Sequence, residues 1–126
     1  MATVRYLVTN VEDSVNYYVK NLGFELKENF GQFAIVEHDD LTLWLSGPKT
    51  SGAKAILDNG DKPIPGGWNR IVIKVDSIDN TVKQLKSLGT DFRNEVLSGV
   101  GGKQVLIRDP SGNPIEINEP SKFAKS

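Results

Sequence analysis

The chain has 126 residues and a mass of 13.8 kDa, with 15 Lys and Arg residues against 16 Asp and Glu. A net charge of -1 provides no diffuse positive field, which argues against binding to nucleic acid or to an anionic membrane surface. The absence of cysteine excludes disulfides, thiolate metal sites and cysteine nucleophiles. The sequence shows neither a secretory leader nor an apolar run of membrane-spanning length, so we expect a cytoplasmic protein.

The first half of the chain predicts a strand, an amphipathic helix and three further strands. A β-prone run from Val4 to Val8 comes first. Apolar residues then recur at the spacing of one helix face, at Val15, Tyr18, Val19 and Leu22. Asn10 or Asp13 can cap this helix, and Gly23 can adopt the left-handed conformation that ends it. The three strand-like segments lie around Phe24 to Leu26, Phe33 to Glu37 and Leu41 to Leu45.

The second half repeats this order about 64 residues later, which indicates an internal duplication. A strand over Ile71 to Val75 leads to a helix with Ser77 as its N-cap and Gly89 at its end. Candidate strands follow at 92–96, 104–107 and 114–118. Between the halves lies a segment rich in Gly, Pro and Lys, as expected for a surface linker that can lie over a pocket.

Neither half is large enough to bury a core alone, so we predict that the two modules pack into a single domain. The predicted boundaries are a first module at about 1–46, a linker at about 46–67, a second module at about 68–120 and a tail at 121–126.

Three segments carry a resemblance to a known family. They are Val11-Glu12-Asp13-Ser14, Asn21-Leu22-Gly23-Phe24 and, most specifically, Arg108-Asp109-Pro110-Ser111-Gly112-Asn113-Pro114-Ile115-Glu116. Together they resemble the vicinal oxygen chelate superfamily of glyoxalase I, extradiol dioxygenases, fosfomycin-resistance enzymes and bleomycin-resistance proteins. The resemblance implies an α+β fold of two tandem βαβββ modules with a concave sheet cleft. A looser similarity over residues 33–36 and 39–44 points to the bleomycin-resistance branch.

Metal-dependent members of this superfamily take His, Gln or Glu ligands from the first and last strands of each module. At the matching positions this sequence has Tyr6, Thr42 or Trp44, Arg70 and Glu116. Only Glu116 is a good ligand, and the guanidinium of Arg70 repels a cation. The chain also has a single histidine, which excludes a site built from several histidines. We therefore predict no metal or other cofactor and no catalytic residue, with Glu116 as the one ligand if a divalent metal does bind.

The positions that lost their metal ligands are expected to become the wall of a ligand site. The predicted ligand-binding residues are Tyr6, Phe30, Phe33, Trp44, Trp68, Arg70 and Glu116. Arg70 and Glu116 also suit an ion pair that links their strands, which is compatible with ligand binding. This set favours a non-enzymatic protein that sequesters a partly aromatic small molecule such as an antibiotic. The resemblance implies a homodimer, while the near-neutral charge argues against bleomycin itself.

Other functions stay open at this point. A metal-dependent lyase, isomerase or dioxygenase would use Glu116 with other ligands. A metal-free epimerase or cyclase would use Glu116 as general base. An interaction module would have no small-molecule pocket, because its own side chains would fill the cavity.

Overall fold

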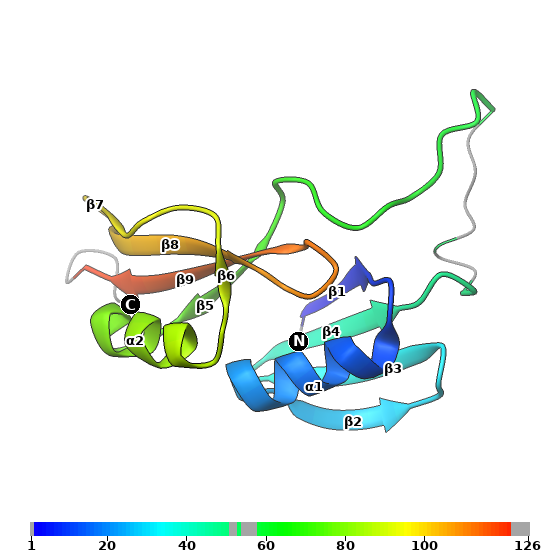
Figure 1. Cartoon of the computed structure of the whole chain (residues 1–126), viewed down its shortest axis with the longest axis horizontal. Coiled ribbons are helices and arrows are strands. Elements are labelled where there is room, and N and C mark those ends of the chain that lie inside the picture. Colours follow the sequence, from blue (N-terminus) through cyan, green and yellow to red (C-terminus); the bar gives the residue numbers. More distant parts are fainter. Residues whose placement is uncertain (1, 51–52, 54–57, 122–126) are drawn as a thin grey trace. The chain divides into compact units, whose positions relative to one another are not determined.

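The computed structural model (Figure 1) describes residues 2–50, 53 and 58–121. Of the tail predicted at residues 121–126, only Ser121 lies inside these ranges. Among the described residues, no helix is both long and apolar enough to cross a lipid bilayer.

The chain forms two compact units, and each contains one sheet and one helix. The first unit comprises Met1–Gly66 together with Pro110–Asn113, and the second comprises Gly67–Asp109 together with Pro114–Ser126. The short loop that carries the Pro-Ser-Gly-Asn sequence therefore belongs with the first unit, although it joins two strands of the second. The fold is α+β, as predicted.

In the first unit the strands are ordered β1-β4-β3-β2. Its elements are β1 (Ala2–Leu7), α1 (Val11–Leu22), β2 (Glu25–Asn29), β3 (Phe33–His38) and β4 (Leu41–Ser46). β1 runs parallel to β4, and the other neighbours are antiparallel. This is the predicted βαβββ order, with small shifts at the strand ends.

α1 begins and ends at residues with clear capping signals. The Asn10 side-chain oxygen accepts a hydrogen bond from the Asp13 backbone N at 2.9 Å, so Asn10 is the N-cap and Asp13 lies inside the helix. Gly23 adopts a φ of 76°, the left-handed conformation in which glycine avoids the steric cost of a side chain. Both ends of the helix are therefore determined locally.

One face of the first sheet packs against α1 (Figure 1). Tyr6 pairs with Leu45 and Leu45 pairs with Ala34, so these three side chains point to the same face. Leu45 and Ala34 are fully buried. From the helix, Tyr18 is also fully buried, and its ring meets that of Phe24 edge-on at 5.3 Å. This helix-covered face is the core of the first unit.

In the second unit the strands are ordered β5-β9-β8-β6, and β7 also pairs with β8. Its elements are β5 (Ile71–Lys74), α2 (Ile78–Ser87), β6 (Asp91–Phe92), β7 (Leu97–Gly99), β8 (Gly102–Arg108) and β9 (Pro114–Pro120). β5 runs parallel to β9, as β1 does to β4, which supports the predicted duplication. Alternate residues of β8 and β9 that face α2 are buried, including Val105, Ile107, Ile115 and Ile117.

The strand predicted at 92–96 is wrong beyond Phe92. Asp91 and Phe92 pair with β8, and the Arg93 backbone N still donates to the Leu106 carbonyl at 2.8 Å, but the chain then leaves the sheet until Leu97. The side-chain oxygen of Asn94 accepts the backbone N–H of Leu106 at 2.8 Å, and so takes a bond that a continuous strand would have made. A polar side chain thus replaces part of the strand ladder at this edge.

α2 is capped by its own N-cap and by a strand residue. The Ser77 hydroxyl accepts from the Asn80 backbone N at 3.2 Å, as predicted. In addition, the Glu119 carboxylate on β9 accepts from the Ile78 backbone N at 2.9 Å. This second bond joins the helix to the sheet and places a negative charge at the positive end of the helix dipole.

We expect Glu119→Ala to lower the free energy of unfolding by about 1 kcal/mol, the usual cost of losing a helix N-terminal acceptor. Glu119→Gln keeps an acceptor oxygen, so its free energy of unfolding should fall clearly less than that of Glu119→Ala. Urea denaturation followed by circular dichroism measures both variants. Equal losses in the two variants would argue against the capping role.

Candidate functional site

The first sheet has a second face, opposite the one that packs against α1. Because side chains of paired residues point the same way, two cross-strand rows define it. These rows are Arg5–Trp44–Ile35 and Leu7–Ser46–Phe33. We call this surface the open face of the first sheet.

Three aromatic rings and a guanidinium gather on the open face. The rings of Phe33 and Trp44 meet edge to face with centroids 5.5 Å apart, and Phe30 stacks on Phe33 at 6.2 Å. The guanidinium carbon of Arg5 lies 5.1 Å from the Trp44 ring centroid. Phe30 is 65% exposed, whereas Phe33 and Trp44 are half-buried. This cluster offers flat apolar surface, with a cation, to a planar ligand. The structure thus brings together three of the predicted residues, and Arg5 was missed.

A cavity of about 290 Å³ adjoins this cluster, because its wall includes the Leu7–Ser46 pair beside Phe33. The linker supplies Pro48, Lys62 and Pro63 to the same cavity, so the linker does lie over a pocket, as predicted. Ser46 is only 1% exposed, and its hydroxyl has no hydrogen-bond partner among the residues that the model describes. Buried hydroxyls are normally satisfied, so this one suits a ligand oxygen or a water molecule.

In the second unit, a buried carboxylate is held by three side chains. Glu116 is 8% exposed, and its Oε1 accepts from Arg70 Nε at 3.1 Å and from a terminal guanidinium nitrogen at 3.0 Å. Asn118 donates to the other oxygen at 3.1 Å. With its amide nitrogen turned toward the carboxylate, Gln104 donates to both oxygens at 3.0 Å. The ion pair considered from the sequence is therefore present, and two amides support it.

Trp68 joins this group through Arg70, and Arg93 packs on the Trp68 ring. The guanidinium carbon of Arg93 lies 4.0 Å from the Trp68 ring centroid, and Arg93 also donates to the Gly67 carbonyl at 3.0 Å. Arg70 donates to the Trp68 carbonyl at 3.3 Å. Trp68 is still 68% exposed. The predicted residues Trp68, Arg70 and Glu116 thus form a second cluster, in which Arg93 is the residue that sequence reasoning missed.

Tyr6 is the predicted site residue that the structure places elsewhere. It lies on the helix-covered face opposite Leu45 and is 8% exposed. Its neighbour Arg5 instead occupies the open face, beside Trp44. A shift of one residue along a strand exchanges the two faces. The polar residues Thr3 and Arg5 alternate with Val4 and Tyr6, a pattern that places Tyr6 on the apolar face, whereas Tyr6 was predicted from the family's metal position.

A comparison with protein families covers nearly the whole chain. Residues 1–117 match the model described as "Glyoxalase/Bleomycin resistance protein/Dioxygenase superfamily". The chain belongs to this superfamily. Its two helices and two sheets match the vicinal oxygen chelate fold that the sequence predicted. No curated protein sequence matches the chain.

Solved structures of the superfamily share this fold at low sequence identity. Lactoylglutathione lyase from Agrobacterium tumefaciens is 19% identical, with a TM-score of 0.73 over 94% of this chain and 92% of that one. A superfamily member from Sphaerobacter thermophilus DSM 20745 is 23% identical, with a TM-score of 0.74 over 94% and 95%. TnmS3, an antibiotic binding protein from Streptomyces sp. CB03234, is 23% identical, with a TM-score of 0.68 over 94% and 93%.

At two of the superfamily's metal positions, Glu116 and Trp44, the surroundings do not fit a divalent ion. Both oxygens of Glu116 already accept hydrogen bonds, and a cation beside them would meet the guanidinium of Arg70. On the open face, the candidate position Trp44 carries no donor lone pair for a metal. Within the described part of the chain, no group of three or more His, Cys, Asp or Glu side chains could hold a metal ion.

Proposed function

We propose that this superfamily member binds and sequesters a planar, partly aromatic small molecule, such as an antibiotic, without converting it. The observation that carries the proposal is that aromatic rings lie against guanidinium groups in each unit, at or near Trp44 and Arg70, two of the positions matched to the superfamily's metal ligands. Phe33, Trp44 and Arg5 make such a surface in the first unit, and Trp68 with Arg93 makes one in the second. The likeness in fold to the antibiotic binding protein TnmS3 supports this choice within the superfamily.

The chemistry of the two clusters also indicates the ligand class. Aromatic faces bind flat conjugated rings, and the guanidinium groups favour rings that carry oxygen substituents or a negative charge. Beside the first cluster, the unpartnered Ser46 hydroxyl and Lys62 line one cavity and can donate to a ligand oxygen. A polyaromatic compound with hydroxyl, quinone or carboxylate groups meets these requirements.

The proposal extends to a homodimer in the cytoplasm with a role in antibiotic resistance. The resemblance to the bleomycin-resistance proteins supports the dimer. Sedimentation equilibrium tests it, because the dimer has about twice the 13.8 kDa mass of one chain.

We expect saturable quenching of tryptophan fluorescence when the protein is titrated with a panel of aromatic antibiotics. Trp44 and Trp68 are the only tryptophans, one in each unit. The variant Trp68→Phe therefore reports quenching at Trp44 in the first cluster, and Trp44→Phe reports quenching at Trp68 in the second. Arg5→Ala should weaken binding by about tenfold, because the ligand loses a cation beside the stacked ring. Tyr17→Ala, which changes an aromatic residue on α1, is the matched control and should leave affinity unchanged.

The same preparation separates sequestration from catalysis. Sequestration predicts that the compound is recovered intact by mass spectrometry and that affinity is insensitive to a chelator. Stoichiometric bound metal with chemical conversion of the compound would contradict the proposal and favour a metal-dependent enzyme. Conversion without metal that is abolished by Glu116→Gln, with binding retained, would favour the metal-free epimerase or cyclase.

A further inference from the structure

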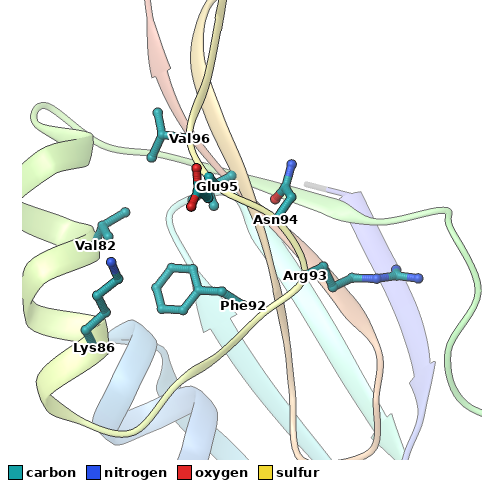
Figure 2. Close-up of a pocket in the computed structure, with 8 residues that line it drawn as sticks. Val82, Lys86, Phe92, Arg93, Asn94, Glu95 and Val96 are labelled. Atoms are coloured by element: carbon teal, nitrogen blue, oxygen red, sulfur yellow. The ribbon is translucent and has the colours of Figure 1, made fainter.

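The second unit contains a cavity of about 430 Å³ whose lining shares only Arg93 with the clusters of the proposed function (Figure 2). It lies on the helix side of the sheet, because α2 contributes Val82 and Lys86 and β8 contributes the buried Val105. Glu116 pairs with Leu106, the residue next to Val105, and so points to the opposite face. The cavity is therefore separated by the sheet from the Arg70–Glu116 cluster.

The duplication explains how this space arises. In the first unit, β2 remains paired with β3 as far as Asn29 opposite Ala34. In the second unit, the last backbone hydrogen bond of the corresponding chain to β8 is from Arg93 N to the Leu106 carbonyl, and the chain pairs with β8 again from Leu97. The intervening residues 93–96 line the cavity together with α2 instead of continuing the sheet. The hydrogen bond from Leu106 N to the Asn94 side chain holds this detour in place.

The walls of the cavity are mostly apolar. Val82, Phe92, Val96 and Val105 supply aliphatic and aromatic surface, and the volume is within the range of small-molecule sites, which run from about 300 to 1,000 Å³. The Phe92 ring points toward α2 between the two sides of the cavity (Figure 2). Such walls suit the apolar body of a small ligand.

Two opposite charges accompany these walls. Lys86 Nζ lies 5.9 Å from the Phe92 ring centroid, and Glu95 reaches the cavity from the detour. Within the described residues, neither Lys86 nor Glu95 forms an ion pair, with the other or with any third residue. The third charged residue, Arg93, extends away from the cavity (Figure 2) and is held against Trp68. The cavity thus presents one available cation and one available anion.

We propose that this cavity binds a small zwitterion with an apolar body, of the amino carboxylate class. Its carboxylate pairs with Lys86, its ammonium group pairs with Glu95, and its body covers Phe92 and the valines. A ligand with a single charge would satisfy one of the two side chains and be repelled by the other. A neutral apolar ligand would leave both charges at the cavity without a partner.

The test uses the uniformly ¹⁵N-labelled full chain and two zwitterionic probes that differ in charge separation, L-phenylalanine and 4-(aminomethyl)benzoate. We expect at least one of them to shift the amide resonances of residues 92–96 and of Val82 and Lys86 saturably. Each probe has two matched analogues that lack one charge. For L-phenylalanine, 3-phenylpropanoate lacks the ammonium group and phenylalanine methyl ester lacks the carboxylate. For 4-(aminomethyl)benzoate, 4-methylbenzoate lacks the ammonium group and the methyl ester lacks the carboxylate. Each analogue should bind about three- to fivefold more weakly than its zwitterion.

Variants of exposed side chains separate this pairing from general effects. Lys86→Gln and Glu95→Gln should each weaken binding by about three- to fivefold. The double variant Lys86→Glu with Glu95→Lys should retain binding, because the zwitterion can bind in the opposite orientation, with its ammonium group at position 86 and its carboxylate at position 95. Lys83→Gln, an exposed change on the same helix outside the cavity, is the control and should have no effect.

Three results would overturn the proposal. One is the absence of saturable shifts at residues 92–96 with both probes at millimolar concentration. Another is equal affinity for a zwitterion and its single-charge analogues. The third is an equal loss of binding affinity in Lys83→Gln and Lys86→Gln. Shifts confined to the surroundings of Trp44 or Trp68 count as the first result, because the probe then binds elsewhere.

Discussion

Glu116→Leu is expected to lower the free energy of unfolding by about 2–4 kcal/mol, compared with the general range of about 3–5 kcal/mol for breaking a buried ion pair from one side. The variant leaves the Arg70 guanidinium and two amide groups without the carboxylate that accepts from them. The Arg70 side chain is 30% exposed, so water relieves part of the cost and the upper end of the range is not expected. Urea denaturation of the variant and the parent chain gives the difference directly.

The double variant Arg70→Met with Glu116→Leu should recover most of this loss, because it removes both charges instead of stranding one. The matched control is Asp91→Leu, which breaks the exposed pair between Asp91 and Arg108 at 3.0 Å in the same unit. That change should cost no more than about 1 kcal/mol. A loss at Glu116 that is no larger than the loss at Asp91 would refute the structural role of the buried pair.

This prediction also bears on function. If Glu116 mainly links β5 to β9, then replacing it changes stability while the stacking surfaces of Trp44 and Trp68 stay in place. A base in an epimerase would instead need an oxygen that can reach the substrate, whereas both oxygens of Glu116 accept hydrogen bonds from neighbouring side chains. Comparing the stability and the ligand affinity of the same variant therefore distinguishes a structural carboxylate from a catalytic one.

The features that the sequence predicted well carry their signals locally. Asn10 and Ser77 accept hydrogen bonds from residues three positions ahead, and Gly23 and Gly89 adopt positive φ at the helix ends. The order of elements followed from these signals and from the apolar spacing between them. The duplication then predicted the second module from the first.

The features that were missed depend on pairing between distant residues. The exchange of Arg5 and Tyr6 is the exception, because the alternation of Thr3 and Arg5 with Val4 and Tyr6 already indicates it, while the family's metal position pointed to Tyr6. The contact of Arg93 with Trp68 joins residues 25 positions apart, and the bond between Leu106 N and the Asn94 side chain beside it is also non-local. The second cluster could be predicted in part, since the family's metal positions pointed to Arg70 and Glu116 and their opposite charges suggested the ion pair.

The loop that carried the family resemblance shows the same limit. Its sequence was recognised, but its contacts could not be predicted, because they join residues 47 to 106 positions apart. Asn113 donates to the Leu7 carbonyl at 2.7 Å and accepts from the Gly66 backbone N at 2.8 Å, while the Ser111 hydroxyl accepts from Thr9 N at 2.9 Å. The loop therefore fastens the end of β1 and the end of the linker, both of which border the cavity beside the open face.

Gly102→Ala should have the largest effect of any single methyl addition in the chain's β8–β9 hairpin, with a loss of about 3 kcal/mol or more. Gly102 has a φ of 118°, which L side chains rarely adopt, and it lies opposite Pro120. An added Cβ would overlap the carbonyl oxygen of Glu119 and lie 2.7 Å from the Ser121 N. These are backbone atoms, so the strand itself has to move. Thermal and urea denaturation measure the loss.

The adjacent Gly101 provides the control, because an added Cβ there meets no atom within 4 Å and its φ is not in the disfavoured range. Gly101→Ala should leave stability unchanged or raise it by up to about 1 kcal/mol, since alanine restricts the unfolded chain. A displaced Glu119 backbone would also carry its side chain away from the Ile78 N–H, so Gly102→Ala should reduce the further loss caused by Glu119→Ala. Additive losses in the double variant Gly102→Ala with Glu119→Ala would mean that the hairpin and the helix cap are independent. Similar stabilities of Gly101→Ala and Gly102→Ala would show that close backbone packing does not require glycine at position 102.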